Sequence, residues 1–447
     1  MVRFSHPQHS IFTDHGRLLA LAVPMILANI TTPLLGLVDT AVLGHMVLPA
    51  MLAGASIGAL ILTQIYWVCG FLRMSSTGLS AQAKGSENAL EQSAKVLWQT
   101  IAVAGLLGLV VVVLQTPILA VGKSLAQPNG EVGLHMQAYF SVRVWGAPAA
   151  MLNLALVGWL VGQQKTKAVM TIQIVGNLLN AFLDLLLVFG FDLSVTGVAL
   201  ASVMAEYSMA IMGLVVALQL VKGVSLRKAW FNSAARKVLL KLNGDMLLRN
   251  LALQLCLAFL TIQGARYGEV PAAVNAILMQ FFVLIALGLD GIAYGVEALV
   301  GEAKGANNHS EIRRRTYQGL LWSTLIAAIY SLIFYSFGDG IIGLLTEHGV
   351  IVTAALPYLP LMVLLPLVGH WCFLYDGVFV GLTRASIMRN TMIISAFGVF
   401  FPVWYFTQQV GNESLWYALL AFLLARGATL AWSFHQLDKQ GRLAEKR

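Results

Sequence analysis

Residues 18–43 read LLALAVPMILANITTPLLGLVDTAVL, the first of many long apolar runs in this chain. The run contains no lysine or arginine, and Asp39 is its one charged side chain. A helix needs about 20 mainly apolar residues to cross the hydrocarbon core of a bilayer. The run therefore predicts a membrane-spanning helix that carries a carboxyl group at membrane depth.

The composition of the whole chain resembles that of this run. Of the 447 residues, 58% are hydrophobic and 11% are charged, and the mean hydropathy is +0.78. Soluble domains carry roughly 25% charged residues, so most of this surface cannot face water. The composition excludes a soluble enzyme, a disordered protein, a coiled coil and a single-pass receptor. Because the apolar runs are continuous rather than alternating, they argue against an outer-membrane barrel. We expect an all-α polytopic membrane protein.

The apolar runs and their polar breaks predict twelve spans. Pro24 and Pro33 interrupt the first span, and a proline inside a membrane helix needs a neighbouring helix or a cavity to satisfy the carbonyl it frees. The predicted spans are 18–43, 49–72, 93–117, 134–160, 168–190, 195–221, 239–264, 270–294, 316–337, 350–380, 390–409 and 415–435.

The lysines and arginines predict the orientation. With Arg143, Arg249 and Arg426 placed inside spans, only Lys123 and Arg266 lie in loops on one side, and the other basic residues lie on the opposite side. Cytoplasmic loops carry the excess of basic residues. We therefore expect both termini of the membrane protein to lie in the cytoplasm. The net charge of +8 then reflects topology, and we expect no nucleic-acid partner.

The two halves of the chain are related by an internal repeat. The matches are collinear and fall at the same places relative to the spans: 79–85 with 299–305, Pro49 with Pro271, Met25 with Met246, and Asn29 with Asn250. Parallel six-span repeats are typical of secondary transporters, with a site where the two lobes meet. The expected division is an N-terminal lobe 1–221, a cytoplasmic linker 222–238, and a C-terminal lobe 239–447 that ends in a short cytoplasmic tail.

Motifs for enzymatic or nucleotide chemistry are missing from the sequence. It has no G-x-x-x-x-G-K-[ST] phosphate loop, no His-Glu-x-x-His and no Gly-x-Ser-x-Gly. We expect that the protein is not an enzyme and binds no cofactor. The energy for its activity would come from an ion gradient or a separate subunit. Cys69, Cys256 and Cys372 lie in apolar runs and are expected to be buried thiols.

Two carboxyl groups are the main site candidates. A carboxylate in the bilayer costs roughly 2.5–3.5 kcal/mol on insertion scales and indicates function. Asp39 has no basic residue in its span, and Asp184 shares one helix face with Asn177 and Asn180 at spacing i, i+3, i+7. In a low-dielectric pocket such groups favour the protonated form and could carry a proton. With Ser202, Asn180 could complete an oxygen cage for Na⁺. The alternative is a pair of protonated carboxyls that only bridge helices.

Other polar residues at membrane depth are secondary candidates. Glu206 follows Ser202 by one helical turn, while Asp290 and Glu297 are seven residues apart in the eighth span. These last two could instead pair with Lys304 or cap helices. The secondary candidates are Asn177, Glu206, Asp290, Glu297 and Asp376.

These features resemble the multidrug and toxic compound extrusion (MATE) family, and within it the DinF subgroup. Twelve spans in two six-helix lobes agree with that family. The resembling stretches are PLLGLVDTAVLG (33–44), AQAKG (81–85), Asn180 with Asp184, GLDGIAYGVEA (288–298) and YDGVFVGLTRASIMRN (375–390).

The resemblance implies a fold and a coupling site. The fold is a V-shaped pair of bundles around a cavity that opens alternately to the two sides, and Pro24 matches the proline at which the first helix bends. Some members place an aromatic residue one turn before the aspartate, where this chain has Leu35, so the choice of proton or sodium stays open. Asp376 could replace part of the acidic pair that NorM-type members carry in the second lobe. The implied coupling residues are Asp39, Asn180, Asp184 and Ser202, and these first three could bind Na⁺.

We therefore expect a monomeric, proton-driven multidrug antiporter that exports cationic or amphipathic compounds. A soft second-lobe surface for varied substrates is expected at Met279, Phe281, Phe282, Tyr294, Met362 and Trp371. The alternatives are a sodium-coupled exporter, a lipid-linked sugar flippase of the same superfamily, a membrane-embedded enzyme and a passive channel.

Overall fold

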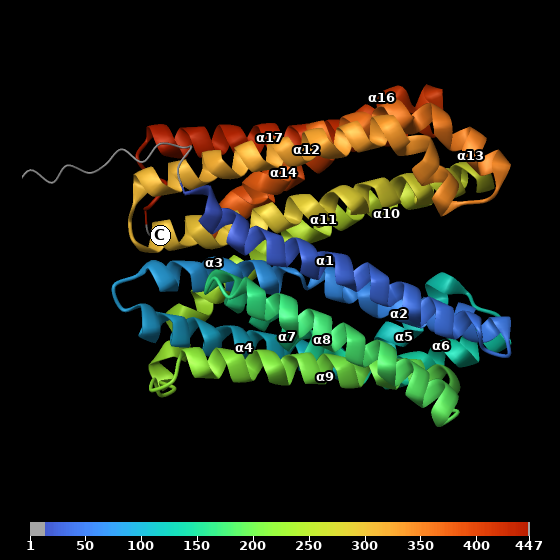
Figure 1. Cartoon of the computed structure of the whole chain (residues 1–447), viewed down its shortest axis with the longest axis horizontal. Coiled ribbons are helices and arrows are strands. Elements are labelled where there is room, and N and C mark those ends of the chain that lie inside the picture. Colours follow the sequence, from blue (N-terminus) through green and yellow to red (C-terminus); the bar gives the residue numbers. More distant parts are fainter. Residues whose placement is uncertain (1–13, 446–447) are drawn as a thin grey trace, which may run out of the picture. The chain divides into compact units, whose positions relative to one another are not determined.

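Residues 14–445 are described by a computed structural model (Figure 1). Helices connected by short loops make up this range, and it holds no β-strand. Within the same residues, twelve helical segments are long and apolar enough to cross a membrane. The expected all-α polytopic fold is thereby confirmed. The segments are His15–Gly44, Pro49–Gly85, Ala89–Val113, Gly130–Gly162, Thr166–Gly190, Ser194–Leu220, Ser233–Arg266, Glu269–Gly305, His309–Leu345, Gly349–Gly381, Ala385–Val410 and Glu413–Lys439.

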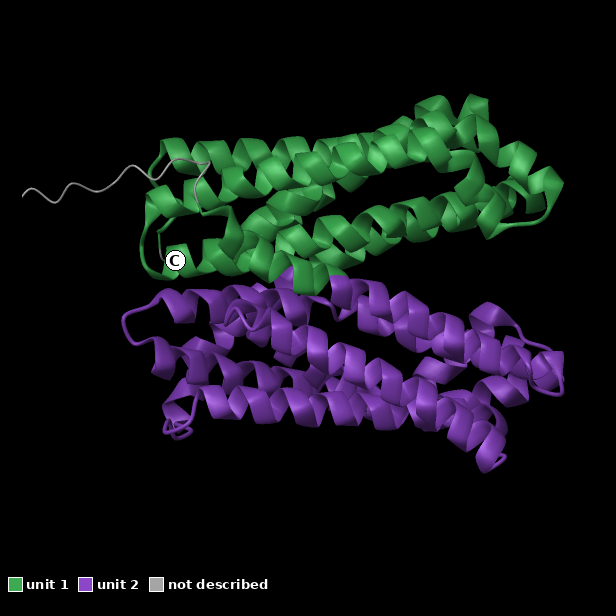
Figure 2. Ribbon diagram, viewed as in Figure 1, with its two compact units in different colours: residues 1–26, 248–447 green, residues 27–247 purple. Residues whose placement is uncertain are grey.

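The chain divides into two compact units, coloured separately in Figure 2. Unit 2 is Leu27–Leu247, and unit 1 combines the chain up to Ile26 with Leu248–Arg447. Both divisions fall inside a helix, in α1 (His15–Gly44) and α10 (Ser233–Arg266). They fall after Ile26 and Leu247, one residue beyond Met25 and Met246, which are matched in the repeat. The compact units therefore differ from the expected lobes 1–221 and 239–447 by the first halves of these two helices.

Unit 2 contains the second half of α1, the first half of α10 and the helices between them. The fourth span is broken by a 3₁₀ turn, η1, and the fifth ends in a π-helical turn, η2. The elements are α2 (Pro49–Val68), α3 (Phe71–Gly85), α4 (Ala89–Val113), α5 (Gln115–Ala126), α6 (Gly130–Arg143), η1 (Val144–Gly146), α7 (Ala147–Gly162), α8 (Thr166–Leu185), η2 (Leu186–Gly190), α9 (Ser194–Leu220) and η3 (Lys228–Phe231).

Unit 1 repeats these irregularities in its own fourth and fifth spans. A 3₁₀ turn, η4, precedes α14, and a π-helical turn, η5, follows α15. This correspondence supports the repeat, because such breaks in membrane helices need specific neighbours. The elements are α11 (Glu269–Gly305), α12 (His309–Leu345), α13 (Gly349–Ala355), η4 (Leu356–Tyr358), α14 (Leu359–Gly381), α15 (Ala385–Ser395), η5 (Ala396–Phe400), α16 (Phe401–Thr407), η6 (Gln408–Val410) and α17 (Glu413–Lys439).

The first half of α1 is fastened to α11 and α12 within unit 1. Arg17 forms a salt bridge of 2.6 Å with Glu302, and Arg315 forms one of 2.8 Å with Asp14. The hydrogen bond from Arg315 lowers the pKa of Asp14 below its ordinary value. Farther along α1, at Ile26, the packing against α11 is close, because a Cβ added at Gly291 would lie only 2.2 Å from Ile26. Charge pairing and close helix packing therefore hold this half-helix in place.

The predicted linker 222–238 lies against unit 2. Gln99 of α4 donates a hydrogen bond of 2.8 Å to the backbone carbonyl of the buried Trp230, and Arg227 pairs with Glu91 at 2.7 Å. Farther along α10, Ser75 donates to Asn243 Oδ1 at 2.7 Å. The segment that follows α9 therefore packs against the other helices of unit 2.

The eighth span continues about three turns beyond its predicted end at residue 294. The sequence becomes polar there, at Glu297, Glu302 and Lys304. Glu297 and Lys304 are nevertheless buried, and the Lys304 Nζ donates to the carbonyl of Leu382 at 2.5 Å. Partners within the protein replace the water that a polar segment would otherwise need, so the helix continues.

Candidate functional site

Asp39 and Asp184 lie side by side in unit 2. Asp39 is in the second half of α1, and Asp184 is the penultimate residue of α8 with no exposed surface. Their carboxyl groups are within hydrogen-bonding reach of each other. Since a carboxylate has no hydrogen to donate, this contact can be a hydrogen bond only when the pair holds a proton. Two residues far apart in the sequence thus form one ionisable pair.

Several oxygen atoms around this pair have no hydrogen-bond partner. They are Asp39 Oδ1, both carboxyl oxygens of Asp184, and Asn180 Oδ1, and all are buried. Burying an unpaired carboxylate costs several kcal/mol, so an ionised pair is unstable unless something neutralises it. A proton or a small cation would supply the missing partner.

Two further oxygen-bearing residues named by the sequence are buried in the same unit. Asn180, one turn before Asp184, and Ser202 of α9 are both buried. Carboxylate, amide and hydroxyl oxygens are ligands for hard cations such as Na⁺. The residue set therefore fits either a proton or a sodium ion.

Asn177 links the two helices that carry the carboxyl groups. Its Nδ2 donates to Thr31 Oγ1 at 2.9 Å, and the Thr31 hydroxyl donates to the Ala28 carbonyl at 2.7 Å. Asn177 thus ties α8 to α1 about two turns from Asp39. We interpret it as a residue that positions the helices, not as a ligand.

A π-helical turn, η2, begins two residues after Asp184. Such turns are inserted at a cost to regular hydrogen bonding and are frequent at functional sites. Apolar side chains from α1, α2, α6, η2 and α9 pack next to it, including Val42, Tyr139, Val188 and Val198. This packing keeps one side of the carboxyl pair in an apolar environment.

Glu206 forms a bidentate ion pair with Arg143. The Arg143 Nη1 and Nη2 donate to the two carboxylate oxygens at 2.7 and 2.6 Å. Arg143 also lies within electrostatic range of Asp39. The sequence offered both residues as separate membrane-depth charges, but 63 positions separate them and no spacing rule connects them.

Asp376 is enclosed by two arginines in unit 1. Arg249 of α10 and Arg426 of α17 both donate to its Oδ2, with a distance of 2.6 Å for Arg249. Arg249 also donates to Asn250 Oδ1 at 2.7 Å. With two guanidinium groups already bound, Asp376 does not offer an unpaired carboxylate to a coupling ion.

Asp290 and Glu297 are placed differently from the carboxyl pair. Asp290 acts electrostatically on Arg426, which adds a second acidic group to the cluster around Asp376. Glu297 is buried on the same helix as Lys304. Both residues belong to unit 1.

Some of the aromatic and methionine residues that were expected to contact substrate lie in the hydrophobic core instead. Phe281 and Met362 have no exposed surface and belong to the hydrophobic core of unit 1, so they cannot contact a substrate in this structure. Met279 and Phe282 pack partly buried against that core. Trp371 keeps 41% of its surface exposed. Residue type alone does not separate core from lining on a membrane helix.

The cysteines lie in spans, as expected. Cys256 and Cys372 are buried, while Cys69 is partly exposed. None of them contacts the carboxyl pair in the interactions described for it. They require no role beyond packing.

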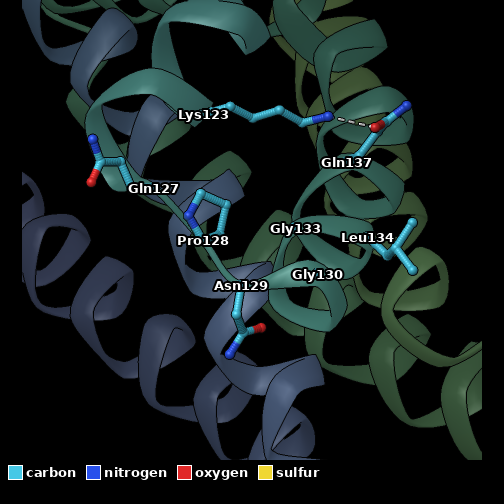
Figure 3. A pocket seen from close by; sticks show the side chains of 8 residues that line it. All are labelled: Lys123, Gln127, Pro128, Asn129, Gly130, Gly133, Leu134 and Gln137. Atoms are coloured by element: carbon cyan, nitrogen blue, oxygen red, sulfur yellow. Dashed lines mark hydrogen bonds between the residues drawn. The ribbon is translucent and has the colours of Figure 1, made fainter.

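Two surface pockets lie outside the carboxyl pair. The larger, of about 340 Å³, surrounds the turn from α5 to α6, where Lys123 donates to Gln137 Oε1 at 2.6 Å (Figure 3). A second, of about 180 Å³, lies beside Arg17 and Glu302. Neither lining includes Asp39 or Asp184.

The twelve helices that are long and apolar enough to cross a membrane define a multi-pass membrane protein. A family model described as MatE matches residues 24–186 and 246–406. The chain belongs to the MatE family, as the sequence resemblance indicated.

Related chains cover three quarters or more of its length. DNA damage-inducible protein F of Escherichia coli is 41% identical over 93% of this chain and 91% of its own. A probable multidrug resistance protein NorM of Thermotoga maritima is 25% identical over 76% of this chain and 74% of its own. The expected DinF subgroup is therefore confirmed.

Solved structures share the fold. A MOP superfamily transporter of Pyrococcus furiosus superimposes with a TM-score of 0.84 at 18% identity, covering 97% of both chains. The bent form of the Vibrio cholerae MATE transporter VcmN gives 0.83 at 20% identity, covering 97% of this chain and 98% of its own. At these identities the likeness concerns the fold alone.

Proposed function

We propose that this chain is a proton-driven exporter of small cationic or amphipathic compounds. The observation that supports it is the Asp39–Asp184 pair, with its buried and unpartnered oxygens. A group that needs a cation to become stable can take one up on one side of a membrane and release it on the other. Exchange follows if bound substrate and bound cation exclude each other.

A proton is the simplest occupant of the pair. It would convert one carboxylate into a donor and so create the hydrogen bond that their separation allows. Sodium coupling is the second candidate, because Asn180, one turn before Asp184, and the buried Ser202 of α9 carry oxygens that a sodium ion could bind. No other cofactor is required in this proposal.

The α1 helix provides a physical route from the pair to the rest of the protein. Its second half carries Asp39 in unit 2, while its first half is fastened in unit 1. Pro24 lies just before the point at which α1 passes from one unit to the other. We propose that cation binding at Asp39 changes the bend of α1 near Pro24 and so drives alternating access.

Substrate class and cellular location extend this proposal. NorM relatives are described as multidrug resistance proteins, which supports export of varied small molecules. We propose that the chain works as a monomer in the bacterial inner membrane, with both termini in the cytoplasm. A lipid-linked sugar flippase is less well supported, because Arg143, Arg249 and Arg426 are each paired with a carboxylate.

Transport by purified protein in proteoliposomes tests the proposal. With an imposed pH gradient, the wild-type protein should export ethidium, a cationic dye. Asp39→Asn and Asp184→Asn should each abolish gradient-driven efflux while still inserting and purifying as monodisperse protein. Full gradient-driven activity in either variant would contradict the coupling assignment.

A further inference from the structure

The Arg143–Glu206 ion pair occupies a break in the fourth span. Arg143 is the last residue of α6, and η1 separates it from α7. Glu206 lies on α9 and receives both terminal nitrogens of the guanidinium. The exposed fraction is 14% for each of the two side chains. A charge pair so little exposed must gain from its position, because desolvation of both ions is costly.

Neighbouring groups fix this pair closely. A Cβ added at Gly146 would lie 2.5 Å from Glu206 Oε2 and 2.9 Å from Arg143 Nη1, so a larger residue there would displace one of the two charged groups. The Arg143 guanidinium lies 5.7 Å from the centre of the Tyr66 ring. Asn153 Nδ2 donates to the backbone carbonyl of Glu206 at 3.0 Å. The guanidinium therefore has a defined position and not a range of rotamers.

That position is electrostatically linked to the carboxyl pair. Val38 and Val142, the sequence neighbours of Asp39 and Arg143, pack against the same apolar cluster, which includes Tyr139. Arg143 therefore lies close enough to act electrostatically on Asp39. Glu206 follows Ser202 by about one turn of α9. The titratable and charged groups concerned are Asp39 on α1, Tyr66 on α2, Tyr139 and Arg143 on α6, Asp184 on α8, and Glu206 and Tyr207 on α9.

We propose that Arg143 is the positioning counter-charge of the Asp39–Asp184 pair. Glu206 holds the guanidinium at a fixed distance, so that its charge stabilises ionised Asp39 after the coupling cation has left. This inference rests on the proposed function, because it assigns a role within the same cation cycle.

The proposal explains why one guanidinium, that of Arg143, occurs together with three carboxyl groups, those of Asp39, Asp184 and Glu206. If Arg143 were absent, an ionised Asp39 would have no positive charge nearby and the pair would retain its cation. If Arg143 contacted Asp39 directly, the ion pair would replace the cation and prevent loading. Because Glu206 holds the guanidinium, the attraction between Arg143 and ionised Asp39 has an intermediate strength. This strength allows the pair both to bind the coupling cation and to release it.

The pH dependence of ethidium binding to the purified full-length protein tests this role. Protons and dye compete in the proposed cycle, so binding should be lost on acidification with a measurable midpoint. Arg143→Gln combined with Glu206→Gln removes both charges and keeps two hydrogen-bonding amides. We expect its midpoint to move to higher pH by about one unit, the effect of one charge several ångströms away in a protein interior.

Glu206→Gln alone should move the midpoint in the opposite direction. It releases Arg143 from its carboxylate, so more of the positive charge acts on Asp39 and dye binding persists to lower pH. Opposite shifts distinguish electrostatic positioning from a loss of structure, which would reduce the amount of folded protein without reversing sign. The Glu206→Gln result alone remains informative if the double variant does not fold.

Controls separate this inference from the proposed function. Arg313→Gln with Asp438→Asn neutralises an ion pair in unit 1 and should leave the midpoint unchanged. Equal midpoints in wild type and both test variants, or shifts in the same direction, would overturn the role of Arg143. By contrast, wild-type binding that does not depend on pH would contradict the proposed proton coupling itself.

Discussion

Two kinds of buried carboxyl group occur in the spans of this protein. Asp376 receives hydrogen bonds from Arg249 and Arg426, whereas both oxygens of Asp184 lack a partner. Asp376→Asn should therefore destabilise the protein by about 3–5 kcal/mol, because it leaves two buried guanidinium groups without their carboxylate. Asp184→Asn removes no ion pair and should leave stability unchanged or increase it.

Thermal unfolding of the purified variants in detergent at neutral pH measures this contrast. The midpoint of Asp376→Asn should fall well below that of wild type, and that of Asp184→Asn should not. A lower midpoint for Asp184→Asn than for Asp376→Asn would show that the pair at Asp184 is mainly structural.

Asn180 provides a residue-scale distinction between the two coupling ions. A proton needs one acceptor, but Na⁺ needs several oxygen ligands. For a proton-coupled exporter, Asn180→Ala should reduce efflux by about three- to tenfold, which corresponds to one lost hydrogen bond of about 1 kcal/mol. Efflux measured in proteoliposomes checks this, with Asn177→Ala as a neighbouring control. Complete loss specific to Asn180→Ala would favour sodium.

Individual residues show how far the sequence can predict a site. Asp39 and Asp184 were found because apolar residues flank them and unpaired charge is costly in lipid. The pairing of Arg143 with Glu206 could not be found, because it depends on how α6 and α9 pack. Asp376 was a secondary candidate in the sequence, and its two arginine partners, which the sequence could not reveal, set it apart from Asp184.

At the scale of elements, close packing between α1 and α11 is a defined constraint. A Cβ at Gly291 would lie 2.2 Å from Ile26 Cγ1, so Gly291→Ala must push the two helices apart. We expect a loss of stability of about 1–3 kcal/mol, the usual cost of overpacking. Gly36→Ala, where a Cβ meets nothing within 4 Å, is the matched control. Equal unfolding midpoints for the two variants would contradict this constraint.

The sequence predicted the helices well but not their irregularities. Runs of apolar residues gave twelve spans because a bilayer requires them. The breaks at η1 and η4 and the π-helical turns at η2 and η5 left no comparable hydropathy signal. Polar helix ends such as Glu297–Lys304 were missed because their partners lie elsewhere in the chain.

At the scale of the whole molecule, the basic residues predict which loops face the cytoplasm. Helix α4 (Ala89–Val113) crosses the membrane once in the proposed topology, with Glu87 just before it and Leu125 in α5, the helix that follows it. In a protein without its native cysteines, Glu87→Cys should react with a membrane-impermeant maleimide only after lysis. Leu125→Cys, at a side chain that is 82% exposed, should react in intact spheroplasts. The reverse pattern would invert the topology.

The source of energy is also a property of the whole molecule. The proposed function requires gradient coupling through the spans, and the Asp39–Asp184 pair supplies buried oxygens without a hydrogen-bond partner there. In everted membrane vesicles, ethidium transport should collapse when a protonophore removes the pH gradient and should persist when sodium is replaced by choline. Vesicles with Asp39→Asn protein give the background rate. Transport that survives the protonophore but requires sodium would assign the pair, with Asn180 and Ser202, to Na⁺, because those added oxygens are what a sodium ion needs and a proton does not.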